Sequence, residues 1–404
     1  MRKVALSEVC DISSGGTPSR STPEFFNGDI PWAKISDIEN ADNGVIYKTE
    51  EQISVDGLKN IRGKLFPKGA LLFAMYGSIG KTAIAGKELS TNQAILGIRP
   101  KADGDIDLSY LKCWFDSNKQ KLINQGRGVA LKNLSATIIR NLEIELPLLD
   151  DQKRIAHLLG KVEGLIARRK QHLQQLDDLL KSVFLEMFGD PVRNEKGWDT
   201  VPFHKVGKFI SGGTPSKSRD DFWDGDFPWV SPKDMKVTKV GDATDHISAK
   251  VFEETSLKRI APDSLLIVVR GMILAHSFPV AINTVEVAIN QDMKAIKPAK
   301  EINVIYLHNC LVALKRQILK LISTAGHGTR KFDSIAMQKL FVPKPPEELQ
   351  NQFAAIVEKV EGIKSRYQQS LTDLESLYGA LSQKAFKGEL DLSRVVLAKG
   401  EPLQ

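Results

Sequence analysis

Basic side chains near expected loops are the residues of this sequence best suited to binding a polyanion. Lysine and arginine donate hydrogen bonds to phosphates and to guanine edges, as nucleic-acid binding requires. His327 is added because it stands between Gly326 and Gly328, as Arg127 stands between Gly126 and Gly128. Each one alone is more often a solvated surface charge, so only the set carries weight. The other candidates are Lys34, Arg62, Lys81, Lys132, Lys217, Lys233, Arg259, Arg270, Arg330 and Lys331.

The overall charge points the same way. The chain has 404 residues and a formal net charge of +7. A basic protein favours an anionic partner, but many basic proteins bind none. Charge alone therefore leaves a nucleic-acid partner and an ordinary basic surface both open.

Motifs for catalysis are missing. Met75 to Thr82 resembles a phosphate-binding loop, but Met75 stands where the first glycine is needed, and the related stretch Arg270 to His276 lacks the Gly-Lys pair. There is no H-E-x-x-H, no G-x-S-x-G and no strand-linked G-x-G-x-x-G. The three cysteines are too widely spaced for a zinc knuckle or a disulfide framework. We expect no catalytic residue, no metal ligand and no cofactor in this chain.

The sequence also lacks targeting features. Its N-terminal apolar stretch is too short for a signal peptide, and no run approaches the roughly 18 apolar residues of a membrane span. We expect a cytoplasmic protein without a membrane anchor.

The elements that would position these residues occur twice. Gly15-Gly16-Thr17-Pro18-Ser19 recurs as Gly212-Gly213-Thr214-Pro215-Ser216, an offset of 197 residues. Later matches, such as Asn92-Gln93 with Asn290-Gln291, keep the offset between 194 and 200. A period this long indicates a duplicated domain, not a solenoid.

Each copy combines a compact α/β part with a long helix. Short β-branched runs, Gly/Pro/Asp turns and one amphipathic helix, 108–123 or 304–322, predict the α/β part. The fold class is α+β, with two similar α/β domains separated by two long helices. The expected boundaries are 1–146 and 200–344 for the domains, 147–189 and 345–389 for the helices, 190–199 for a linker and 390–404 for a tail.

Both long helices carry heptad stripes. Apolar residues recur at seven-residue spacing from Ile155 to Val183, interrupted at Arg169, and from Phe353 to Leu381. Such stripes are packing surfaces, so we expect the helices to pair as an intramolecular antiparallel coiled coil. Rigid paired helices would hold two domains at a fixed separation.

Taken together, these motifs resemble the specificity subunits of Type I restriction-modification systems over nearly the whole chain. The residues that carry the resemblance are the two Gly-Gly-Thr-Pro-Ser turns, the Gly-Asp-x-Pro-Trp stretches that end at Trp32 and Trp229, the loops near Gly77 and Gly271, the Gly-x-Gly pairs, and the Pro147/Gln152 and Pro345/Gln350 helix starts.

The resemblance implies a division of labour between subunits. The two α/β domains would be target-recognition domains, each reading one half of a bipartite, asymmetric site on double-stranded DNA. Two modification subunits would bring S-adenosylmethionine and methylate adenine, and restriction subunits would bring ATP and Mg²⁺ for translocation and cleavage. The helices would be the spacer and the docking surface.

Two other readings remain at this point. One is a DNA methyltransferase with a built-in recognition domain, but Lys344-Pro345-Pro346-Glu347 is no substitute for the catalytic tetrapeptide of that class. The other is a non-catalytic coiled-coil scaffold, which leaves the duplication of the α/β domain unexplained.

Overall fold

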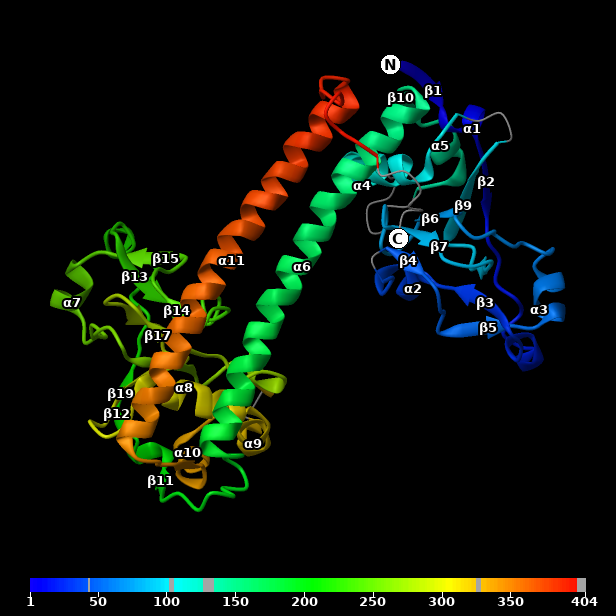
Figure 1. The fold of residues 1–404 in the computed structure, drawn as a ribbon. Coiled ribbons are helices and arrows are strands. Elements are labelled where there is room, and N and C mark those ends of the chain that lie inside the picture. The colour runs from blue at the N-terminus through cyan, green and yellow to red at the C-terminus, as the bar shows by residue number, and fades with distance from the viewer. Residues whose placement is uncertain (43, 102–104, 126–133, 325–327, 398–404) are drawn as a thin grey trace. The chain divides into compact units, whose positions relative to one another are not determined.

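The computed structural model describes residues 1–42, 44–101, 105–125, 134–324 and 328–397. It divides into two compact units. Unit 1 is Met1–Gln171 with Gln368–Gln404, and unit 2 is His172–Tyr367. Each unit contains one α/β domain and a segment of both long helices (Figure 1).

The α/β domain of unit 1 is built on two mixed sheets and a strand pair. Its central strand β6 (Leu71–Ala74) is buried along its whole length, as its apolar sequence Leu-Leu-Phe-Ala predicts. The five-stranded sheet has the order β2 (Cys10–Ser14), β9 (Ile95–Pro100), β6 (Leu71–Ala74), β7 (Thr82–Ala85), β4 (Val45–Ile46). The three-stranded sheet has the order β5 (Glu51–Ile53), β3 (Ile30–Ala33), β8 (Ser90–Thr91), and β1 (Arg2–Ala5) pairs with β10 (Glu143–Leu146).

The domain of unit 2 repeats the two sheets and the strand pair of unit 1, and its described residues add one short pair, 323–324 with 330–331. Parallel pairing occurs at the same two places, β4 with β7 and β3 with β8 in unit 1, and β14 with β17 and β13 with β18 in unit 2. The duplication predicted from the sequence is confirmed. The strands are β12 (Gly207–Ser211), β19 (Met293–Pro298), β16 (Leu265–Val268), β17 (Val280–Asn283) and β14 (Lys239–Val240), then β15 (Asp245–Ile247), β13 (Phe227–Val230) and β18 (Ala288–Ile289), with the pairs β11 (Thr200–Pro202) to β22 (Phe341–Pro343) and β20 (Ser323–Thr324) to β21 (Arg330–Lys331).

Short helices connect these strands, and one expected helix is split. The predicted helix over 304–322 is instead α8 (Val304–Ala313) and α9 (Lys315–Leu321). Leu314 between them has ψ −2°, away from the helical value near −42°, which interrupts the hydrogen-bond ladder. The others are α1 (Leu6–Val9), α2 (Ile35–Glu39), α3 (Val55–Asn60), α4 (Leu108–Gln125), α5 (Ala136–Arg140), α7 (Lys250–Glu254) and α10 (Ser334–Lys339), with 3₁₀ turns at Pro23–Phe26, Phe203–Lys205, Asp220–Phe222 and Met272–Ala275.

The long helices α6 (Leu149–Phe188) and α11 (Glu347–Lys387) pair within each unit and run in opposite directions (Figure 1). Both begin after proline with two acids in the first turn, which suits the positive end of the helix dipole. The predicted antiparallel pairing is confirmed. The contacts that fix the direction are Glu163 with Tyr378 (3.1 Å) and Lys170 with Glu375 (2.9 Å) in unit 1, and Asp177 with Lys364 (2.8 Å) and Phe184 with Phe353 (ring centroids 5.5 Å) in unit 2.

A buried glutamine joins each long helix to the domain that precedes it. Gln152 accepts a hydrogen bond from the Asp107 N–H at 2.8 Å and donates to the carbonyls of Asp105 and Pro147. Gln350 makes the equivalent bonds in unit 2, accepting from the Asn303 N–H at 2.9 Å. Both amides are fully buried, so each satisfied side chain fixes the angle at which its helix leaves the domain.

The next contact between domain and helix differs between the units. In unit 1, Lys112 on α4 pairs with Asp116 at 2.8 Å and with Glu163 on α6 at 3.4 Å. In unit 2 the corresponding residue on α8 is His308, and its Nε2 atom is buried without a hydrogen-bond partner. It lines a cavity of about 330 Å³. The charged residues that line this cavity with it are Asp177, Lys181, Lys239, Glu361 and Lys364.

His308 predicts a pH-dependent stability of unit 2. Burial lowers its pKa, although Val280 and Glu361 act to raise it. Because the folded pKa lies below the unfolded value near 6.5, the unfolded chain binds more protons, and stability falls as pH drops below about 6.5. Urea unfolding of the His308→Gln chain should show a smaller loss of stability between pH 7 and pH 5.5 than the unsubstituted chain. Equal losses in both chains would contradict the prediction.

Candidate nucleic-acid interface

Two turns form the same platform in each unit. The Gly-Gly-Thr-Pro-Ser turn follows β2 or β12 and lies against the Asn-Gln turn before β9 or β19. A side chain at Gly15 would place Cβ 2.1 Å from the Thr91 carbonyl oxygen, and one at Gly212 would place it 2.1 Å from that of Asn290. Only glycine allows this approach, which explains why the first glycine of each pair recurs.

A buried tryptophan holds the platform from below. Trp32 is 1% exposed and Trp229 is 6% exposed. The Trp32 indole N–H donates to the Gly16 carbonyl at 2.9 Å, and that of Trp229 donates to the Gly213 carbonyl at 3.0 Å. These tryptophans are therefore part of the scaffold in both domains.

A repeated aspartate braces the chain beyond the tryptophan. Asp37 accepts from the backbone N–H groups of Lys34 and Glu50 at 2.7 and 2.8 Å. Asp234 accepts in the same way from Ser231 and Thr244, both at 2.9 Å. The scaffold thus fixes the backbone from which charged side chains project.

The top of the platform is polar and exposed. Thr17 donates a hydrogen bond to the Gln93 side-chain oxygen, and Thr214 donates to that of Gln291. Each of these exposed glutamines also carries an amide nitrogen, which is a hydrogen-bond donor.

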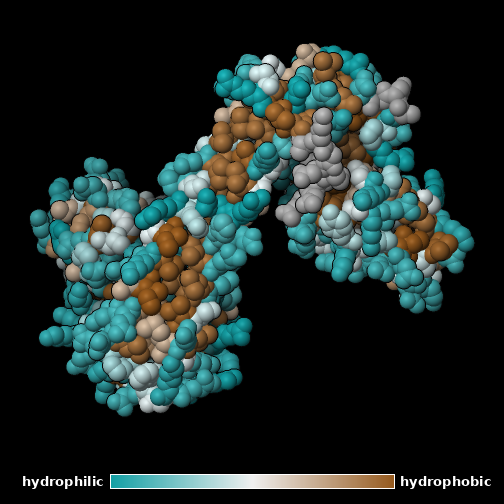
Figure 2. Space-filling view, in the orientation of Figure 1, coloured by the Kyte–Doolittle hydropathy of each residue, from teal (hydrophilic) through white to brown (hydrophobic). Residues whose placement is uncertain are grey.

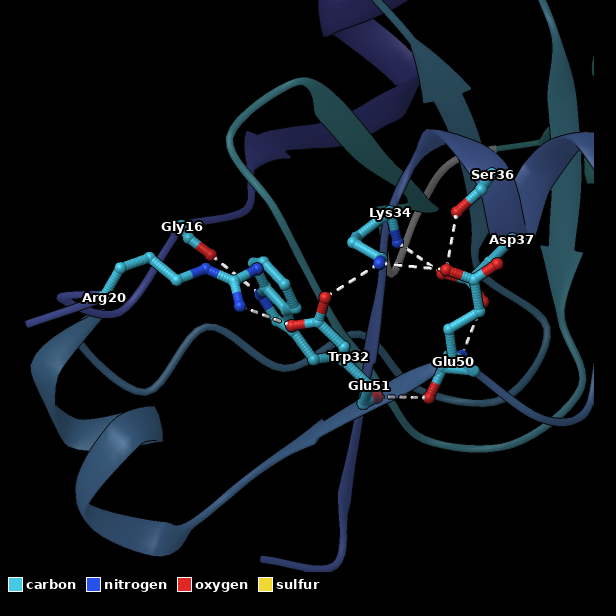
Figure 3. Close-up of polar contacts among 9 residues, drawn as sticks. Gly16, Arg20, Trp32, Lys34, Ser36, Asp37, Glu50 and Glu51 are labelled. Carbon is cyan, nitrogen blue, oxygen red and sulfur yellow. Dashed lines mark hydrogen bonds and ion pairs between the residues drawn. The ribbon is translucent and has the colours of Figure 1, made fainter. Parts of the chain in front are cut away.

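In unit 1 the platform is flanked by a network of opposite charges (Figure 3). Lys34 contacts Glu51 at 2.8 Å and Glu50 at 2.9 Å, and Arg20 contacts Glu51 at 2.8 Å. The hydrogen bonds that Lys34 donates to Glu51 and Glu50 raise the pKa of Lys34. Burial acts to raise the pKa of Glu51, but hydrogen bonds from Arg20 and Lys34 outweigh it, so the pKa is lowered. Lys34, Glu50 and Glu51 are therefore charged at neutral pH.

In unit 2 the platform separates two hollows. Lys217 and Lys233 line the first, of about 600 Å³, where Lys233 contacts Asp245 at 2.9 Å. Arg270 and Lys331 line the second, of about 510 Å³. Gln291 lines both. The structure therefore brings four predicted cations together around one platform.

The remaining predicted residues lie elsewhere or are paired. Arg62 is exposed after α3, and Lys81 contacts Glu39 at 3.1 Å. Arg259 contacts Glu286 at 3.1 Å and stacks over Phe252, and Arg330 donates to Thr324 at 2.6 Å. None of these four lines the two hollows beside the platform. The candidates outside the described residues are Arg127, Lys132 and His327.

Sequence reasoning missed several residues at this site. Arg20 precedes Lys217 by the repeat offset of 197 residues, so the repeat itself could have identified it. Lys294 and His204 line the second hollow of unit 2, and Lys294 donates to Ser211 at 2.8 Å. No motif marks these two, because Lys294 lies on β19 and His204 lies in the 3₁₀ turn Phe203–Lys205, far apart in the sequence.

Within the described ranges, no group of three or more histidine, cysteine, aspartate or glutamate side chains is arranged to hold a metal ion. The thiols of Cys10, Cys113 and Cys310 are buried, and burial raises the pKa of each to about 12. In the same part of the chain, no helix has the length and hydrophobicity to cross a membrane.

The fold and the paired platforms define a duplicated two-domain architecture. The family model described as Type I restriction modification DNA specificity domain matches residues 1–177 and 195–373. The chain belongs to this family, as its sequence motifs predicted.

Relatives and solved structures agree with the family assignment. The MjaIX Type I restriction enzyme specificity subunit of Methanocaldococcus jannaschii is 25% identical over 95% of this chain and 92% of its own length. The EcoR124I/EcoR124II specificity subunit of Escherichia coli is 33% identical over 52% of each chain. A Type I S subunit structure from M. genitalium has TM-score 0.57 at 16% identity, covering 95% of this chain and 96% of its own. That likeness confirms the fold.

Proposed function

We propose that this chain is the DNA-reading specificity subunit of a Type I restriction-modification complex, and that each α/β domain reads one half of a bipartite site. The observation that carries the proposal is a scaffold repeated in both domains and surrounded by different charged residues. Because the two domains share one scaffold, we expect them to perform the same task. Because the charged side chains around the scaffold differ, we expect the two domains to read different half-sites. Phosphate contacts would position the domains, and base contacts would specify sequence.

The partners follow from family membership and from the helices. Two modification subunits and the restriction subunits would dock on the helix pair and bring S-adenosylmethionine, ATP and Mg²⁺. Hydrophobic surface gathers over the α6 and α11 segments of each unit (Figure 2). The exposed apolar residues on these helices that support docking are Leu149, Leu165, Leu179, Leu185, Ile363 and Leu377. The chain would itself carry no reaction and would act in the cytoplasm.

A domain exchange tests this function. The chain is co-expressed with modification subunits in a host without adenine methylation, and methylated adenines are mapped. We expect a bipartite target. Replacing residues 200–344 with the corresponding segment of a relative should change one half-site and leave the other unchanged. A change in both halves, or in neither, would contradict the proposal. Methylation or cleavage by the purified chain alone would favour the enzyme reading.

A further inference from the structure

One carboxylate occupies the same place in both domains. Glu51 lies directly opposite Trp32 where β5 pairs with β3, and Asp245 lies directly opposite Trp229 where β15 pairs with β13. The two residues differ in type and are 194 positions apart, so the repeated motifs alone do not reveal the match. The strand register does.

Each of these carboxylates holds a lysine that comes from a different position in the repeat. Lys34 reaches Glu51 at 2.8 Å, and Lys233 reaches Asp245 at 2.9 Å. The repeat offset that links the tryptophans matches Lys34 with Ser231, so the two lysines are not equivalent. The acid–lysine pair therefore recurs although the position of the lysine does not.

In unit 1 the side chains of the pair are partly shielded, with Lys34 26% and Glu51 28% exposed. Stability does not account for the pair in unit 2, because the Lys233 side chain is 64% exposed and exposed ion pairs contribute little to stability. Phosphate binding does not account for it either, because a carboxylate repels phosphate. Beside DNA, a carboxylate is favourable where it accepts a hydrogen bond from a base, and the amino group of cytosine N4 is its usual donor.

A lysine next to a carboxylate also matches a whole base pair. In the major groove, a G·C pair presents the guanine O6 and N7 acceptors beside the cytosine N4 donor. The pair in each domain places the complementary donor and acceptor side by side. In unit 1 the acceptor is the Glu51 oxygen that contacts Lys34, because the other oxygen, Oε2, is buried. In unit 1, Arg20 adds a second donor to Glu51 at 2.8 Å, which holds the carboxylate in place (Figure 3).

We propose that Glu51 with Lys34, and Asp245 with Lys233, each read a G·C base pair in the major groove. The carboxylate accepts from cytosine N4 and the lysine donates to guanine. This inference rests on the proposed DNA-reading function. It identifies one specificity-determining position in each half-site.

The test uses the full chain with its modification subunits. Methylated adenines are mapped for the unsubstituted chain and for the Glu51→Gln and Asp245→Asn chains. Glu51→Gln should relax one G·C position in one half-site, and Asp245→Asn should relax one in the other. The expected loss of discrimination at each position is about 5- to 150-fold. Lys34→Met and Lys233→Met should relax the same positions.

Matched carboxylate–lysine pairs away from the platform serve as controls. Asp56 contacts Lys59 at 3.0 Å in unit 1, and Glu301 contacts Lys344 at 2.6 Å in unit 2. Asp56→Asn and Glu301→Gln should leave the target unchanged. If a variant complex gives no methylation, DNA sequences that it binds are selected from a random duplex library. These sequences also show which base is preferred at each position of the target.

Several results would overturn the inference. These are an unchanged target in the Glu51→Gln and Asp245→Asn complexes, relaxation at an A·T position, or loss of preference at every position. If the unsubstituted complex has a bipartite target and a variant gives any of these results, only the proposal of base-reading pairs is refuted. No bipartite target in the unsubstituted complex refutes the proposed function as well.

Discussion

Replacing Trp32 with alanine should lower the free energy of unfolding of unit 1 by about 3–5 kcal/mol. The ring is 1% exposed and belongs to a small core with Ile53 and Ile61. Its removal leaves a cavity and deprives the Gly16 carbonyl of its indole donor. Urea unfolding followed by circular dichroism measures the effect without relying on the fluorescence of the deleted ring.

The exposed aromatic residue Tyr47 provides the control, because its side chain is 54% exposed in the same unit. Tyr47→Ala should change the free energy of unfolding by no more than about 0.5 kcal/mol. A Trp32→Ala complex that still folds should keep its DNA target, since the same ring stands in both domains. Unchanged stability combined with an altered target would make Trp32 a base-reading residue.

The repeat explains why so much of the fold was predictable. Two copies with a nearly constant offset imply two domains of one topology, and the heptad stripes imply paired helices. The break at Leu314 was not predictable, because the apolar pattern continues through it and only the backbone dihedral departs from the helix. Propensity and periodicity do not record such local departures.

The candidate site was predictable in part. Lys217, Lys233, Arg270 and Lys331 were chosen for their charge and for their places near loops, and they line two adjoining hollows. The ion pairs could not be predicted from the sequence, because an acid such as Glu51 meets its lysine only after strand pairing places it there. Arg20 likewise meets Glu51 only because the fold places its turn beside β5.

Four cations other than Lys233 line the hollows of unit 2, and neutralising all four should have the largest effect on DNA affinity. The variant carries Lys217→Gln, Arg270→Gln, Lys294→Gln and Lys331→Gln. Each phosphate contact contributes about 0.9 to the slope of log affinity against log salt concentration. If all four contact phosphates, the slope should fall by about 3.6, and affinity near 0.15 M salt should drop about 100- to 1,000-fold.

The measurement is binding of the chain with its modification subunits to a duplex that carries the mapped target, over 50–300 mM salt. A second variant neutralises four exposed lysines of unit 2 that line neither hollow: Lys300, Lys320, Lys339 and Lys359. It removes the same charge, so it controls for the general loss of electrostatic attraction. An equal change of slope in both variants would mean that the hollows do not contact DNA. A selective change would locate the phosphate-binding surface of unit 2 at the platform that Gln291 shares between the two hollows.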